Sequence, residues 1–341
     1  MRKLLKFFLV LLLVIVVNNL IFYAVKPTSY CWANEVANSK NEYLLKHGGA
    51  FNTIFIGTSK TLNQADVTTF DSLTNYRTHS FNFGVEGVGA AEIFYFTDNL
   101  LKLNKNIKYA FIEIYDIDLV RTENINTSRI KYDYDFNVWA FTINSIWHSN
   151  FGFVTKVESI ANSSLAMVGW LLKFDLLKDV IGYNNNDNGH QRDLGINQTG
   201  FAPCHGEELK FSDIPESRRN YLLDSTSDQR MATATGKILN NYKPLKFNKP
   251  YFLKLQALIK RLESNNVKVF LVLAPRINDA QLSNIVPVFM KIDGCTKINL
   301  ADPKVNPEFY EMKYSFDARH LNLTGAELYT WKLAKEFNNS L

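Results

Sequence analysis

The chain has 341 residues, of which 46% are hydrophobic and 21% are charged, and its formal net charge is +5. This composition is typical of a globular protein that buries a sizeable core. Part of the positive charge lies within the first six residues, and no Lys/Arg cluster follows it, so we expect no nucleic-acid partner.

The N-terminus predicts a membrane anchor. Three basic residues lie among the first six, and the uncharged, mostly apolar run Phe7–Val25 follows them. At helical rise these 19 residues nearly cross the hydrocarbon layer of a bilayer. A cleaved signal peptide is the alternative, but its apolar region is normally shorter, and Phe22-Tyr23-Ala24 is a poor cleavage site. We therefore expect residues 1–26 to be an uncleaved signal-anchor.

The positive-inside rule then gives the topology. The basic flank stays cytoplasmic, and everything after about residue 26 lies outside the cytoplasm. No later run is long enough to span; the best, Ile160–Leu172, has 13 uncharged residues and predicts a buried helix. We expect a linker over residues 27–50 and one α/β domain over residues 51–341.

Strands and helices alternate in that domain, which predicts a parallel sheet covered on both sides, a three-layer α/β/α arrangement of the flavodoxin-like kind. Apolar, β-branched runs predict strands at Thr53–Ile56, His79–Val85, Lys108–Tyr115, Val267–Leu273 and Lys297–Leu300. Apolar residues at helical spacing predict helices at Ala90–Leu103, Tyr251–Leu262 and Leu323–Phe337.

Residues 119–249 interrupt this alternation, and we expect them to form a large insertion after the third strand. The segment contains an aromatic, helical stretch around Trp147–Leu177 and the polar run from Tyr183 to Gln198. It follows the carboxyl end of a strand, where open α/β sheets bind ligands. The position favours a lid or a substrate wall.

Two short motifs far apart in the chain indicate the chemistry. Gly57-Thr58-Ser59 follows the first strand, and Asp317 and His320 precede the last helix. A serine hydroxyl is a poor nucleophile until a base takes its proton, and an acid that holds the base completes a Ser-His-Asp triad. Each motif alone also fits an ordinary turn or a helix cap. Together they predict Ser59 as nucleophile, His320 as base and Asp317 as its partner.

The same reaction needs donors for the oxyanion. We expect the N–H of Ser59 and that of Gly87, in the run Asn82–Gly87 after the second strand, to supply them. Asn82 and Arg276 are candidates to bind substrate, Arg276 because it follows a strand at the same edge and suits an anionic or sugar group. A structural salt bridge is the alternative for Arg276.

Cysteine and histidine residues give no comparable signal. The three cysteines, Cys31, Cys204 and Cys295, leave room for one disulfide at most. The cluster Cys204-His205 with Glu207 and Glu208 is too short for a closed metal site. We expect no metal and no cofactor.

These motifs resemble the SGNH/GDSL hydrolase superfamily. Gly57-Thr58-Ser59 is similar to its first block, Asn82–Gly87 to its second, and Asp317-x-x-His320 to its fifth. The similarity covers residues 52–118 and 267–337. One block departs: the third usually reads Gly-x-Asn-Asp, whereas this strand continues Glu113-Ile114-Tyr115-Asp116 and lacks the Asn that supplies an oxyanion donor.

The anchor and the missing Asn make the chain more similar to membrane-anchored envelope members, such as the alginate O-acetylation and D-alanyl-lipoteichoic acid transfer proteins. The resemblance implies a serine esterase or O-acyltransferase that acts on an acylated surface glycan or polymer. It also implies a membrane-bound O-acyltransferase as partner. The alternative is a weakly catalytic or non-catalytic assembly partner of such an acyltransferase.

Overall fold

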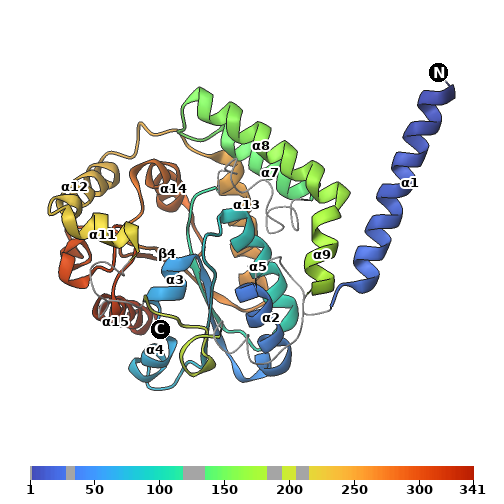
Figure 1. Ribbon diagram of the computed structural model, residues 1–341. Helices are drawn as coiled ribbons and strands as arrows, with labels where there is room; N and C mark the ends of the chain where they lie inside the picture. The colour runs from blue at the N-terminus through green and yellow to red at the C-terminus, as the bar shows by residue number, and fades with distance from the viewer. Residues whose placement is uncertain (1, 28–34, 118–134, 183–193, 205–214) are drawn as a thin grey trace.

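The computed structural model describes residues 2–27, 35–117, 135–182, 194–204 and 215–341 (Figure 1). At its centre lies a sheet of five strands: β1 (Thr53–Gly57), β2 (Ser80–Gly84), β3 (Tyr109–Glu113), β4 (Lys268–Leu273) and β5 (Thr296–Asn299). All neighbouring strands pair in parallel, in the order β2-β1-β3-β4-β5. The strand after β1 in sequence, β2, lies on one side of β1, and the next strand, β3, lies on the other side. The strand order therefore reverses between β1 and β3. In open sheets of this kind the crevice at the reversal is where ligands bind.

The strands are short and apolar because both faces of the sheet are covered. Every residue of β1 is buried, as expected for a strand whose sequence does not alternate between polar and apolar residues. Side chains on successive residues point to opposite faces. Ile54 and Ile56 therefore enter one hydrophobic cluster and Phe55 enters the other. The five strands expected from the sequence all form, with bounds that differ by two residues at most.

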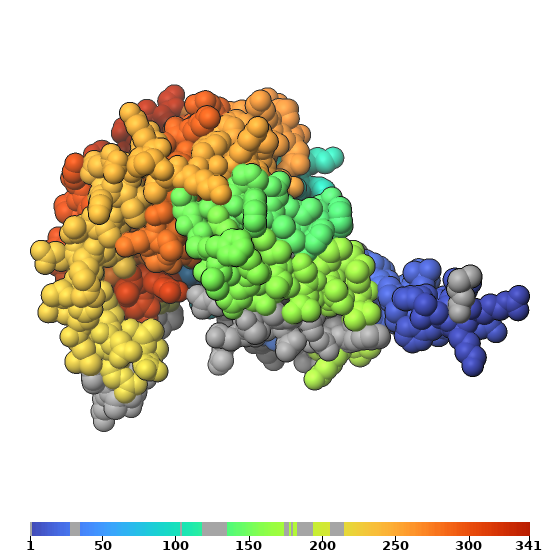
Figure 2. Space-filling model, turned by 90° about the horizontal axis from the view of Figure 1, so that it is seen from above, coloured from blue at the N-terminus to red at the C-terminus, as the bar shows by residue number. Residues whose placement is uncertain are grey.

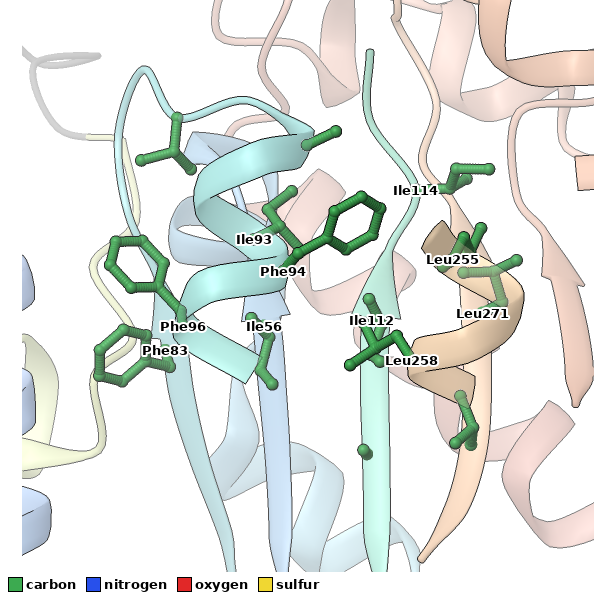
Figure 3. Packing of buried hydrophobic residues seen from close by; sticks show 14 of the residues in the cluster. Ile56, Phe83, Ile93, Phe94, Phe96, Ile112, Ile114, Leu255, Leu258 and Leu271 are labelled. Atoms are coloured by element: carbon green, nitrogen blue, oxygen red, sulfur yellow. The ribbon is translucent and has the colours of Figure 1, made fainter. Parts of the chain in front are cut away.

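One face is covered mainly by helices α5 (Ala90–Leu103), α13 (Lys249–Ser264) and α14 (Asp279–Lys291). Figure 3 shows Ile93 and Phe94 of α5 and Leu255 and Leu258 of α13 packed over the strands. The helices expected at Ala90–Leu103 and Tyr251–Leu262 form as α5 and α13, because their apolar residues repeat at helical spacing, whereas α14 was not expected. Asn248 starts α13 by accepting a hydrogen bond from the Tyr251 N–H at 3.2 Å.

The other face carries the helices α3 (Ser59–Gln64), α4 (Val67–Leu73) and α15 (Leu323–Asn339). Aromatic rings from three adjacent strands stack across it. The Phe111 ring lies 4.4 Å from Phe55 and 4.5 Å from Phe270, centroid to centroid, and Phe337 of α15 packs over them. This aromatic row packs β1, β3 and β4 together, and β1 is the strand that leads into the turn with Ser59.

The segment expected to be a linker, residues 27–50, is not one throughout. It contains helix α2 (Glu35–His47) and the 3-10 turn η1 (Gly48–Ala50). The polar sequence of α2 gives little sign of burial, yet Lys40 is buried. Its ammonium donates to the carbonyl oxygens of Asn82, Gly84 and Gly200 at 2.7–2.9 Å. These tertiary contacts tie the segment into the domain, so the linker prediction was wrong for α2.

Between β3 and α13 the chain forms further helices: α7 (Phe136–Trp147), α8 (Phe153–Leu172), α9 (Phe174–Gly182), η3 (Ile196–Gln198), α11 (Glu216–Leu223) and α12 (Ser227–Asn240). The run Ile160–Leu172 does lie in a helix, α8. The expectation that this helix is buried was wrong on one side, because Leu165, Val168 and Leu171 are exposed.

Helix α1 (Arg2–Val25) precedes the domain and projects from its side (Figures 1 and 2). It is long and apolar enough to cross a membrane, and within the described residues it is the one helix with that length and composition. The turns η4 (Pro307–Tyr310) and η5 (Met312–Tyr314) lead from β5 towards α15.

Candidate active site

Ser59 lies at the sharp turn from β1 into α3. Gly57 ends the strand, Thr58 is the N-cap of α3, and Ser59 is its first residue. The Thr58 hydroxyl accepts a hydrogen bond from the Lys60 N–H at 3.2 Å, as N-cap residues do. The turn brings the half-buried Ser59 side chain to the carboxyl edge of the sheet.

The buried carboxylate of Glu113 fixes this turn through hydrogen bonds. Glu113, the last residue of β3, accepts hydrogen bonds from the Thr58 N–H at 2.8 Å and the Thr61 hydroxyl at 2.7 Å. Its other oxygen accepts from the Thr58 hydroxyl at 2.9 Å. Gly57 makes the close approach possible, because a Cβ there would overlap the side chains of Thr61 and Glu113.

His320 and Asp317 lie in a tight loop before α15. One Asp317 oxygen accepts hydrogen bonds from the backbone N–H groups of Arg319 at 2.7 Å and His320 at 2.8 Å. The next residues start α15, where the Asn322 side chain accepts from the Gly325 N–H at 2.9 Å and donates to Lys313 O. These local bonds fix the imidazole relative to the carboxylate before any substrate binds.

The structure brings the three predicted residues together, although Ser59 and His320 lie 261 positions apart. Ser59 Oγ lies 2.9 Å from His320 Nε2. On the far side of the ring, His320 Nδ1 lies 3.1 Å and 3.2 Å from the two oxygens of Asp317. With its Nδ1–H directed at the carboxylate, the neutral imidazole leaves Nε2 to accept the serine proton. That is the arrangement of a Ser-His-Asp triad.

The electrostatics of Asp317 suit its place in this chain. Burial raises its pKa, but the hydrogen bond and charge of His320, together with the Arg319 and His320 N–H groups, outweigh burial and lower the pKa to about 2. Asp317 is therefore ionised at neutral pH. An ionised Asp317 stabilises the imidazolium that forms when His320 takes a proton.

Lys60, the residue after Ser59, links the turn that carries Ser59 to the loop that carries Asp317 and His320. Its ammonium donates to Arg276 O at 3.0 Å and to Arg319 O, in the loop that carries His320. Burial lowers the pKa of Lys60 to about 8, and the charges of Glu113 and Asp317 partly oppose that effect. A buried cation thus connects α3, the end of β4 and the Asp317–His320 loop.

The segment between β3 and α13 also reaches this region. Arg218 of α11 donates a hydrogen bond to Phe316 O, and its guanidinium lies 4.4 Å from the centroid of the Phe316 ring. Phe316 immediately precedes Asp317. Burial raises the pKa of Cys204 to about 12, and the nearby charges of Asp317 and Glu86 contribute. Part of the expected insertion therefore borders the candidate site.

Gly87, the expected second oxyanion donor, follows β2 at the same edge. The register pairs Gly57 with Gly84, so the turn after β2 runs beside the turn that carries Ser59. Gly87 is exposed and has a φ of +62°, a conformation that favours glycine. Its position is compatible with the predicted role, which stays a prediction.

Asn82 does not face an open surface. It is fully buried, and its amide donates to the carbonyl oxygens of Thr61 at 2.7 Å and Ala65 at 2.9 Å, while its oxygen accepts from the Gly84 N–H. The two amide bonds fasten α3 and the residue that follows it to β2, and the bond from Gly84 lies within β2 itself. The geometry therefore gives Asn82 a structural place and does not support direct substrate binding.

Arg276 is buried as well. Its guanidinium forms a salt bridge with Asp228 of α12 at 2.7 Å and donates to Phe309 O and to the Ser315 hydroxyl. This is the structural salt bridge that the sequence left open as the alternative. A guanidinium with these partners fixes α12 against the loop before α15, so we do not assign it to substrate.

Lys60 and Glu113 were missed as site residues in the sequence. A lysine next to a candidate nucleophile and an acid at the end of an apolar strand were the available signals. Neither signal reveals the partner, because the partners are backbone carbonyls and hydroxyls from distant segments.

The remaining expectations concern cysteines, metals and cavities. Cys204 and Cys295 are free, and Cys31 and the His205–Glu208 stretch lie outside the described residues. Among the residues described, no group of three metal-ligating side chains converges. A hollow of about 600 Å³ lined by Asn104 and Val267 lies near the amino ends of β3 and β4, at the edge opposite Ser59.

Comparisons of the chain with protein-family models, with curated proteins and with solved structures find no match. The assignment of the site therefore depends on the geometry and on the sequence motifs.

Proposed function

We propose that this protein is a serine-nucleophile enzyme that cleaves or transfers acyl esters. The observation that carries the proposal is the continuous hydrogen-bonded chain from Ser59 through His320 to Asp317. It lies at the carboxyl edge of a parallel sheet, where α/β enzymes bind ligands.

The chemistry follows from that chain. Ser59 Oγ attacks the carbonyl carbon of an acyl ester while His320 Nε2 takes the serine proton. The tetrahedral oxyanion needs N–H donors, for which Ser59 and Gly87 are the candidates. His320 then returns the proton to the departing alcohol, and an acyl-serine remains. Water releases the acid by hydrolysis, or a second hydroxyl takes the acyl group in a transfer.

The particular enzyme we propose is an SGNH-type esterase or O-acyltransferase of the cell envelope. The strand order β2-β1-β3-β4-β5 is that of flavodoxin-like sheets and supports a three-layer α/β/α domain. The apolar helix α1 supports a single-pass protein whose basic N-terminus is cytoplasmic and whose domain is extracytoplasmic. The substrate is an O-acyl group, acetyl in the simplest case, on a surface glycan or polymer.

The test uses the full-length protein in detergent or nanodiscs with p-nitrophenyl acetate. Turnover that disappears in Ser59→Ala, while the variant keeps the unfolding midpoint of the native protein, supports the proposal. A matched control is Ser264→Ala, which changes an exposed serine on α13. Equal turnover by the native protein and Ser59→Ala would contradict a serine mechanism.

A second candidate is an assembly partner of a membrane-bound O-acyltransferase, and one observation favours it. Where the related third block supplies an Asn donor, β3 ends in Glu113, whose carboxylate accepts bonds and has no N–H to donate. In cells, alkali-released acetate from the surface polymer separates the two. If deletion of the protein abolishes polymer acylation and Ser59→Ala retains it fully, the protein acts as an assembly partner and not as the catalyst.

A further inference from the structure

Helix α8 presents an apolar face to the outside. Its exposed fraction is 78% at Val154 and 56% at Leu165. The exposed apolar residues recur every three or four positions, at Val154, Val157, Ala161, Leu165, Val168 and Leu171. That spacing places them along one side of the helix, with the exposed Glu158 on the same side between Val154 and Ala161. We call these six residues the α8 outer face.

The fully buried residues of α8 are polar or small: Ser159, Asn162, Ser163 and Ala166. The half-buried Ile160 and Trp170 pack beside them. The neighbouring helix α7, which packs against it, buries Thr142, Ser145 and Ile146. A surface helix of a soluble protein has the reverse pattern, with its apolar stripe towards the core. Small and hydroxyl side chains between helices, with large apolar ones outside, are the pattern of helices that pack within a membrane.

The α8 outer face is continuous with the membrane helix. Asn19 of α1 donates a hydrogen bond to Leu171 O at 3.0 Å, and Asn18 donates to Leu172 O. At the end of α8, the Lys173 ammonium lies 4.9 Å from the Phe22 ring and 4.3 Å from the Trp170 ring. These contacts place the C-terminal end of α8 against α1.

The direction of α8 fits a position at the membrane surface. In Figure 1, α8 runs across the direction of α1 instead of alongside it. Figure 2 looks down on α7 and α8, with α1 projecting from the same side of the domain. A helix that crosses the bilayer and a second helix in the plane of its surface have this mutual arrangement.

We propose that the α8 outer face binds the lipid bilayer, so that α8 lies in the membrane surface beside α1. Interfacial helices bury their apolar face about 5–10 Å into the boundary between headgroups and acyl chains. Lys156 and Glu158 near the start of α8, together with its modest apolar content, fit a helix in the interface and not a second span. Lipid is the occupant that the contact with α1 favours over a second copy or another protein. The inference goes beyond the esterase proposal and does not depend on Ser59.

The experiment uses the full-length chain in nanodiscs that contain doxyl-labelled phosphatidylcholine. In a background with Cys31, Cys204 and Cys295 replaced by serine, Leu165→Cys carries the fluorophore NBD. The matched control carries NBD at Leu223→Cys, an equally apolar and 72% exposed position on α11. Val157→Cys provides a second position on the α8 outer face.

We expect blue-shifted NBD emission at residues 165 and 157, and quenching by shallow doxyl groups several-fold stronger than at residue 223. Equal emission and quenching at 165 and 223 would overturn the proposal. Blue-shifted emission at 165 without lipid quenching would overturn it too, because it would identify a protein partner or a second copy on this face.

Discussion

The carboxylate of Glu113 accepts hydrogen bonds from both the backbone N–H and the hydroxyl of Thr58, the residue before the candidate nucleophile. A residue of the third strand thereby fixes the turn of the first. Glu113 is buried, so its charge has little access to water, and its bonds to the turn replace that hydration. In the superfamily that the sequence motifs resemble, the third block adds an oxyanion donor; here β3 supplies an acceptor next to the candidate nucleophile.

Replacing Glu113 by Gln should destabilise the turn. The amide presents N–H groups where a carboxylate oxygen now accepts several donors, so at least one donor loses its acceptor. We expect a loss of about 1–3 kcal/mol in the free energy of unfolding. Turnover of p-nitrophenyl acetate should fall with it, because the Ser59 hydroxyl moves relative to His320. Chemical denaturation and steady-state kinetics measure both effects. The control Glu327→Gln, at an exposed position of α15, should change neither the free energy of unfolding nor the turnover.

Replacing Ser59 or His320 by Ala should remove turnover to a similar extent. The two side chains act as one unit, so either loss leaves the other without its partner. The double variant should be no worse than the single ones. Both single variants should retain the native circular dichroism, because the turn is held by Thr58, Thr61 and Glu113 and not by the Ser59 hydroxyl. Additive losses in the double variant would contradict a shared mechanism.

Local patterns in the sequence predict much of this fold. Apolar runs such as Thr53–Ile56 and Val267–Leu273 identify the strands, and Ala90–Leu103 matches α5 at both ends. The convergence of Ser59, His320 and Asp317 also follows from the sequence, since a strand-end serine and a late Asp-x-x-His reach one edge of a parallel sheet. What these patterns miss is tertiary. The helix that carries Lys40 is polar and therefore resembles a linker in sequence. Only the fold reveals that the Lys40 ammonium binds carbonyl oxygens from distant segments.

Arg276 illustrates a second limit. Its place after β4 indicates the carboxyl edge of the sheet, where Ser59 also lies, but only the fold reveals that Asp228 of α12 pairs with it. The α8 outer face gives a third example. An uncharged run predicts burial, and in a membrane-associated protein the lipid can take the place of the core.

Replacing Asp317 by Asn should slow acyl turnover by orders of magnitude. The amide cannot hold His320 in the tautomer that leaves Nε2 free to accept a proton. The nucleophile stays in place, so the residual rate should exceed that of Ser59→Ala. Steady-state kinetics of the two variants side by side test this order. A rate for Asp317→Asn within a few-fold of the native protein would contradict the assigned role.

The same residue predicts a stability change at low pH. The pKa of Asp317 is about 2 in the folded chain, below its ordinary value of 3.8. The ionised form therefore stabilises the fold above about pH 4, and this contribution, about 2 kcal/mol, is lost as the pH falls towards 2. Asp317→Asn should lack this part of the pH dependence. Unfolding midpoints between about pH 4 and pH 2 measure it, with Asp293→Asn, an exposed position, as control.

Lys60 should act as a positioning residue for the triad. Its ammonium joins the Arg276 and Arg319 carbonyl oxygens, so Lys60→Met frees the loop that carries His320. We expect kcat to fall at least ten-fold, with KM for p-nitrophenyl acetate little changed, because the base and not the substrate loses its place. Lys60→Arg, which keeps the charge and the donors, should recover part of kcat. Lys254→Met on the exposed side of α13 is the matched control.

The pH dependence of stability separates this role from simple packing. Burial lowers the pKa of Lys60 to about 8 in the folded chain, whereas the unfolded chain keeps a value near 10.5. Between these values the unfolded state binds more protons, so the free energy of unfolding should rise with pH, by at most about 1.4 kcal/mol per pH unit. Lys60→Met should flatten that rise and Lys254→Met should leave it intact. An identical slope in Lys60→Met, combined with an unchanged kcat, would show that the buried ammonium holds neither the loop nor the base.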